Sequence, residues 1–136
     1  MQDALALAGL NILVVDDDED SRFYLSTVLE ADGAIVTAVT SAALALQVLP
    51  ELQPDIFVCD IAMPEEDGYT LIRKVRTLKP KGGGRVPALA LTAYADSEDR
   101  IRALAAGFQA HVAKPVEPGE LVDIVANLVA SYRHQL

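Results

Sequence analysis

The chain has 136 residues, of which 51% are hydrophobic, and it carries one cysteine and a formal net charge of −9. This length indicates one domain, residues 1–136 with a core from about residue 11 to about residue 130, which needs no disulfide or structural metal. The lone cysteine excludes an internal disulfide and favours a cytoplasmic location. The negative charge argues against direct binding of nucleic acid, and no apolar run reaches the roughly 18 residues of a membrane span.

Short apolar runs alternate with helical patterns along the chain. The runs are typical of strands covered on both faces, and they occupy residues 11–15, 34–39, 55–59, 87–91 and 109–113. Helical spacing of apolar residues follows each run, over residues 19–31, 42–49, 67–78, 96–106 and 117–129. Ser41 is expected to cap the second helix, and Pro50 to help end it after Leu49.

Basic residues gather around the third predicted helix. Arg73, Lys74 and Arg76 are expected on the side of this helix that faces solvent. With three more in the loop 79–85 (KPKGGGR), they make six of the eleven Lys and Arg residues. We interpret the cluster as a solvated surface, because a nucleic-acid site would have aromatic residues among the basic ones.

Five strands that alternate with five helices predict an α/β fold, a parallel sheet with helices on both faces. In such sheets, ligands bind outside the carboxyl ends of the strands. The residues that directly follow each strand are therefore expected to converge on one site.

Charged and hydroxyl residues follow four of the predicted strands. They are Asp16, Asp17, Asp18, Asp60, Thr92 and Lys114. Crowded carboxylates resist ionisation unless a cation lies between them, and Mg²⁺ suits a site of carboxylates, waters and a phosphate oxygen. These groups fit phosphoryl transfer, in which a carboxylate accepts the phosphoryl group as an acyl phosphate.

Four segments resemble the receiver domain of two-component response regulators: ILVVDDDEDSR at 12–22, FVCDIAMPEEDGYTLI at 57–72, ALTAYA at 90–95 and HVAKPVEPGEL at 111–121. The resemblance extends from about residue 11 to about residue 128. It implies a flavodoxin-like, doubly wound sheet of five parallel strands in the order 2-1-3-4-5, with five helices.

The resemblance also implies a metal-dependent phosphorylation site. Asp60 would accept a phosphoryl group from a phosphohistidine of a histidine kinase or a histidine phosphotransfer protein. Asp17 would bind Mg²⁺ directly, Asp16 would assist, and Asp60 and the backbone carbonyl of Ala62 would complete the protein ligands. The domain would promote only its own phosphorylation and dephosphorylation, so we do not expect it to be an enzyme.

The same resemblance implies a switch. Lys114 would bridge Asp60 and the phosphate, and Thr92 would move inward to bind a phosphate oxygen. His111 stands where the family usually has tyrosine or phenylalanine, so it is the candidate switch residue although its ring is smaller and titratable. Ala62 and Tyr94 flank the site at positions that influence the access of water.

Two other functions remain as alternatives. Asp16-x-Asp18 after a strand is similar to haloacid-dehalogenase phosphatases, but a second acidic pair after the lysine is missing and Asp60 stays unexplained. We assign Asp18 to the cap of the first helix rather than to the metal site. The third hypothesis is a protein-interaction module that works without phosphorylation.

Partners and context follow from the resemblance. The kinase or phosphotransfer partner is expected to dock on the first helix and the loops around Asp60 and Pro115. The chain is either a stand-alone regulator or the receiver of a hybrid histidine kinase, and the segment ALAGLNILVVDD slightly favours the second. A monomer and a weak dimer through the last two helices both remain open.

Overall fold

The computed structural model describes residues 5–93 and 96–135. Strands and helices alternate in the order β1 (Asn11–Val15), α1 (Glu19–Ala31), β2 (Ile35–Val39), α2 (Ala42–Leu52), β3 (Ile56–Asp60), α3 (Gly68–Thr77), a short 3₁₀ turn (Pro80–Gly82), β4 (Ala88–Thr92), α4 (Ser97–Ala106), β5 (Ala110–Ala113) and α5 (Pro118–Gln135). The strands are all parallel and lie in the order β2-β1-β3-β4-β5, which confirms the predicted fold.

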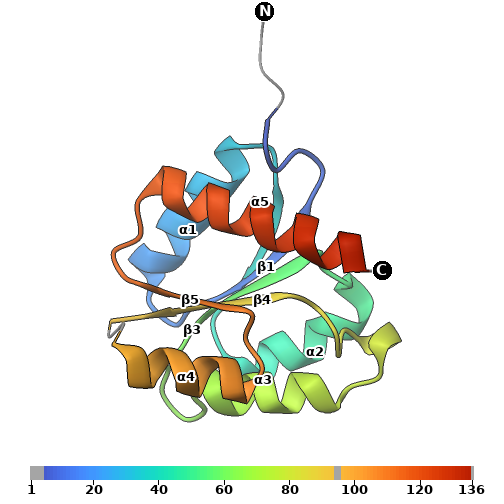
Figure 1. Ribbon diagram of the computed structural model, residues 1–136, viewed down its shortest axis with the longest axis vertical. Helices are drawn as coiled ribbons and strands as arrows, with labels where there is room; N and C mark the ends of the chain where they lie inside the picture. The colour runs from blue at the N-terminus through green and yellow to red at the C-terminus, as the bar shows by residue number, and fades with distance from the viewer. Residues whose placement is uncertain (1–4, 94–95, 136) are drawn as a thin grey trace, which may run out of the picture.

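Two layers of helices enclose the sheet (Figure 1). Helices α1 and α5 cover one face, and α2, α3 and α4 cover the other. Because side chains alternate along a strand, Ile12 and Val14 pack into the cluster under α1 and α5, while Leu13 and Val15 pack into the cluster on the opposite face. Strands β3 and β4 are buried along their whole length, which explains their continuous apolar sequences.

The second and last helices are longer than predicted. Pro50 was expected to help end the second helix, but α2 continues through it to Leu52 and ends at Gln53, whose φ is 46°. A proline so near the end of a helix forfeits a single N–H bond, and the final turn still closes because Gln53 N donates to Leu49 O at 3.0 Å.

Over the described ranges, no helix has both the length and the apolar character to cross a bilayer.

The expected position of Arg76 was wrong. Its guanidinium lies between loops: Nε donates to Gly107 O at 3.0 Å, and Nη1 donates to Gly84 O at 3.1 Å and to Val86 O at 2.6 Å. These bonds join α3 to the segments that precede β4 and β5. Arg73 is exposed as predicted, so only part of the basic cluster is a solvated surface.

Candidate functional site

Three carboxylates meet at the carboxyl edge of the sheet. Asp16 and Asp17 follow β1, and Asp60 is the last residue of β3. Oxygen atoms of the three side chains lie within 4.8 Å of one another. Asp16 is completely buried, Asp60 is 6% exposed, and Asp17 is open to solvent. The structure thus brings together carboxylates that are 44 positions apart in the sequence, at the place where the strand pattern predicts them.

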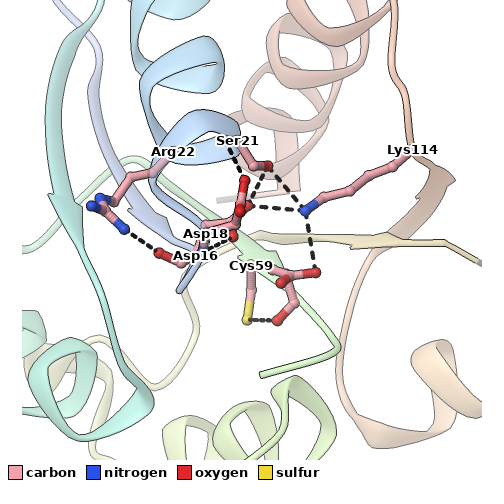
Figure 2. A network of polar contacts seen from close by, with 7 residues as sticks. Asp16, Asp18, Ser21, Arg22, Cys59 and Lys114 are labelled. Atoms are coloured by element: carbon pink, nitrogen blue, oxygen red, sulfur yellow. Dashed lines mark hydrogen bonds and ion pairs between the residues drawn. The ribbon is translucent and has the colours of Figure 1, made fainter. Parts of the chain in front are cut away.

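Lys114 reaches into this cluster from the end of β5 (Figure 2). Its Nζ lies 3.0 Å from Asp16 Oδ2 and 3.4 Å from Asp60 Oδ1. The backbone N of Lys114 donates to Thr92 O at 2.7 Å, and Thr92 is buried at the end of β4. All the side chains predicted to share the site therefore come from adjacent strand ends.

Residues at the start of α1 hold Asp16 in place. Asp18 N donates to Asp16 Oδ1 at 2.9 Å, Ser21 Oγ donates to Oδ2 at 2.5 Å, and Arg22 Nη1 donates to the backbone O at 2.9 Å. The Asp18 carboxylate caps α1 by accepting from Ser21 N at 2.8 Å, as predicted.

Sequence reasoning missed Ser21 and Arg22 as parts of the site. Their positions five and six residues after Asp16 place them on the first turn of α1, beside the end of β1. A signal was available, because only three residues separate the end of β1 from the start of α1, which keeps the first turn of the helix close to the carboxyl end of the strand.

The electrostatics of the cluster indicate an excess of negative charge. Burial raises the pKa of Asp60 to about 6; Lys114 opposes this rise and Asp16 adds to it. Burial acts to lower the pKa of Lys114, but hydrogen bonding to Asp16 and the charges of Asp16 and Asp60 outweigh it, so that pKa is raised. One lysine faces three carboxylates, and this set of oxygen donors fits a hard divalent cation.

The loop after β3 brings the backbone of Asp60 close to the start of α3. Gly68 N donates to Ile61 O at 2.9 Å, and a Cβ on Gly68 would lie 2.9 Å from both Asp60 O and Ile61 Cα. Only glycine fits this contact without a shift of backbone. Ala62 lies exposed in the same loop, and its carbonyl remains a predicted metal ligand.

Cys59 is the core residue that its position in β3 predicted. It is completely buried, and its Sγ donates to Asp60 O at 3.2 Å. Burial raises the pKa of the thiol well above its ordinary value, with the charge of Asp60 adding to the rise. A neutral buried thiol has no role as a nucleophile.

His111 lies on β5, opposite Ala90 of β4. It is half-buried, burial lowers the pKa of its imidazole, and the charges of Asp99 and Arg100 near the start of α4 act on it in opposite directions. The residues that the structure describes supply no hydrogen-bond partner for His111 Nε2, which is buried. The prediction for Tyr94 falls outside the described residues.

A family model for the response regulator receiver domain matches residues 12–126. The chain is 52% identical over 119 residues to an uncharacterised 14.6 kDa protein of Leptolyngbya boryana, covering 88% of this chain and 89% of that one. It is 40% identical to protein PetR of Rhodobacter capsulatus, over 82% of this chain and 45% of PetR. It is 35% identical to hybrid signal transduction histidine kinase D of Dictyostelium discoideum, over 93% of this chain but only 8% of that kinase.

Solved structures show the same similarity. A putative response regulator from Chloroflexus aurantiacus is 38% identical with a TM-score of 0.83, covering 89% of this chain and 98% of its own. The receiver domain of sensor histidine kinase PA1611 from Pseudomonas aeruginosa is 32% identical with a TM-score of 0.82, covering 90% and 99%. That structure has a magnesium ion coordinated in its active-site cleft.

Proposed function

The chain belongs to the response regulator receiver domain family of two-component signalling, and we propose that it is a switch controlled by phosphorylation of Asp60. The observation that carries the proposal is the grouping of Asp60 with Asp16, Asp17 and Lys114 at the sheet edge. An acceptor carboxylate, two further acids and an ammonium are the groups that phosphoryl transfer to a side chain requires.

The carboxylates of Asp16, Asp17 and Asp60, with the carbonyl of Ala62, would hold Mg²⁺. The fit rests on the donor set, because three carboxylates with oxygen atoms within 4.8 Å of one another carry more charge than Lys114 neutralises. When bound, the ion supplies positive charge between the carboxylates and the oxygens of a phosphoryl group. The magnesium reported for the PA1611 receiver domain supports the assignment by similarity.

The transfer step uses groups of this chain. An oxygen of the Asp60 carboxylate attacks phosphorus and forms a P–O bond. The P–N bond to the imidazole of the donor breaks at the same time, and its electron pair stays on the imidazole nitrogen. Lys114 stabilises the charge of the phosphoryl oxygens, because its ammonium already lies 3.4 Å from Asp60 Oδ1. The product is an acyl phosphate on Asp60.

Phosphorylation is proposed to act outward through Thr92 and His111. Thr92 ends β4, and its backbone O accepts from the backbone N of Lys114, so its hydroxyl would serve as the donor to a phosphate on Asp60. His111 lies on the neighbouring strand β5, and the charges of Asp99 and Arg100 near the start of α4 act on its pKa in opposite directions. A change at Thr92 is thus passed to α4, and the equilibrium between two arrangements of this face shifts.

A histidine kinase or histidine phosphotransfer protein is proposed as the donor. A hollow of about 570 Å³ lies beside the site, between α1 and the segment after β5; its lining includes Ser21, Leu25, Leu91, Lys114 and Val116. Acidic side chains lie in the same lining, at Asp18, Asp20 and Glu117. An apolar surface that ends at Lys114 suits a helix that delivers a phosphohistidine to Asp60.

The test is to incubate the protein with acetyl phosphate, with and without Mg²⁺, and to measure its intact mass. We expect a gain of one phosphoryl group that requires Mg²⁺ and is absent from Asp60→Ala. Glu30→Ala, which removes an exposed acid near the far end of α1, is the matched control and should gain the group as the wild type does. No gain under any condition would instead support an interaction module, and turnover of unrelated phosphate esters would support a phosphatase.

A further inference from the structure

Ser21 lies between the two charged groups that control the acceptor. Its Oγ is 2.5 Å from Asp16 Oδ2 and 3.0 Å from Lys114 Nζ, and that Nζ is itself 3.0 Å from Asp16 Oδ2 (Figure 2). The hydroxyl donates to the carboxylate and accepts from the ammonium, so the three groups form a closed triangle.

The triangle decides where the ammonium rests. Asp16 Oδ2 and Ser21 Oγ each lie 3.0 Å from Lys114 Nζ, whereas Asp60 Oδ1 lies at 3.4 Å. The ammonium has three protons, and two of them are directed to the pair Asp16 and Ser21. Its contact with Asp60 is therefore the longest of the three.

The position of Ser21 is itself well determined. Its backbone N donates to the capping carboxylate of Asp18 at 2.8 Å, which fixes the first turn of α1. The Asp16 carboxylate is held from its other side, because Asp18 N donates to Oδ1 at 2.9 Å. The hydroxyl thus occupies a defined position from which it keeps hold of Lys114.

We propose that Ser21 is a positioning residue for Lys114. The inference rests on the proposed phosphorylation of Asp60. By accepting a hydrogen bond from the ammonium, Ser21 keeps Lys114 beside Asp16 and holds its contact with Asp60 Oδ1 at 3.4 Å, so that the Asp60 oxygens are less tightly paired when they attack phosphorus. Without the hydroxyl, the ammonium loses one of its two close acceptors and turns to Asp60. A tighter ion pair there occupies the oxygen that must attack and makes it a weaker nucleophile.

The test compares Ser21→Ala with Ser21→Thr, which restores the hydroxyl; the hollow beside Ser21 has room for the added methyl group. We expect Ser21→Ala to slow phosphorylation by acetyl phosphate at saturating Mg²⁺ by about tenfold, the effect of one lost hydrogen bond to a charged group. Ser21→Thr should recover most of the rate. Ser26→Ala, which removes a hydroxyl from the same helix away from the site, is the control and should match the wild type.

A second measurement needs no phosphoryl donor. In protein without Mg²⁺, the ammonium resonance of Lys114 in a ¹H–¹⁵N spectrum should shift and exchange faster with water in Ser21→Ala, and should return towards the wild-type position in Ser21→Thr. If Ser21→Ala does not fold, Ser21→Cys carries the same expectations, because it keeps the size of the side chain but bonds weakly.

The outcomes separate the two proposals. An unchanged rate together with an unchanged Lys114 resonance in Ser21→Ala overturns the role of Ser21. A slower rate that Ser21→Thr fails to recover overturns it too, because the effect would not then belong to the hydroxyl. If the wild type gains no phosphoryl group, the proposed function fails, whereas the Lys114 resonance still reports whether Ser21 holds the ammonium.

Discussion

Replacing Asp60 by asparagine is expected to stabilise the protein at neutral pH when Mg²⁺ is absent. Burial raises the pKa of this carboxyl from 3.8 to about 6. At pH 7.5 the carboxylate is charged in both states, and its charge is less stable in the folded protein than in the unfolded chain. At about 1.4 kcal/mol for each pKa unit, the penalty that Asp60→Asn removes is about 3 kcal/mol. For a domain of this size, Tm should rise by about 10 °C.

The sign of this effect sets its pH dependence. The folded carboxyl binds its proton more tightly than the unfolded one, so the wild type gains stability relative to Asp60→Asn as the pH falls from about 7 towards 4. Asparagine does not titrate, and the difference between the two proteins should therefore shrink through this range and nearly vanish at pH 4. Urea denaturation with a chelator at pH 7.5, 6, 5 and 4 measures the free energy of unfolding of both proteins.

Asp17→Asn is the matched control, because its carboxylate belongs to the same cluster but is exposed. We expect it to change stability by less than about 0.5 kcal/mol. The reasoning is refuted if Asp60→Asn is no more stable than the wild type at pH 7.5, or if its advantage stays constant as the solution is acidified. Added Mg²⁺ should also reduce the advantage, since the ion stabilises the wild type by binding.

Three further results are expected. Gly68→Ala should lower the free energy of unfolding by about 2 kcal/mol in urea denaturation, because its Cβ would lie 2.9 Å from backbone atoms of Asp60 and Ile61; a stable variant would show that this loop yields. Arg76→Ala should cost about 3 kcal/mol by the same assay, since it leaves three backbone carbonyls without their donor, whereas exposed Arg73→Ala should cost under about 0.5 kcal/mol; equal losses would contradict this. Burial lowers the pKa of His111 below 6.5, so the unfolded chain takes up the proton first as the pH falls. Thermal melts should therefore show the Tm of the wild type falling relative to that of His111→Gln below about pH 6.5. Parallel plots of Tm against pH would contradict this.

Hydropathy, turn signals and the order of elements were sufficient to predict the layers of this fold. Strands β3 and β4 have continuous apolar sequences because both of their faces are covered. The helix cap at Ser41 could be predicted because it depends only on a hydrogen bond to a residue three positions away. The end of α2 was harder to predict, because Pro50 costs one hydrogen bond there and the surrounding contacts decide whether the helix tolerates it.

Arg76 shows what packing adds. Its place on an amphipathic helix predicted a solvent-facing side chain, yet its partners include backbone carbonyls up to 31 positions away. A side chain that bonds to distant backbone has no periodic signal in the sequence. The positions of the loops before β4 and β5 therefore had to be known before the hydrogen-bond partners of Arg76 could be assigned.

In the candidate site, too, the sequence predicts which residues meet, and packing decides their distances and burial. Parallel strands bring their carboxyl ends to one edge, so the convergence of Asp16, Asp17, Asp60 and Lys114 follows from residue order alone. The hydrogen bonds of Lys114 to Asp16 and Ser21, and the burial that raises the pKa of Asp60, depend on how α1 packs against β1 and on where the chain leaves β5. The strand and helix pattern of the sequence identifies which groups meet, because it predicts the order of the parallel strands. The charge balance and hydrogen bonds of these groups are decided only when the helices pack on the sheet and exclude water from its edge.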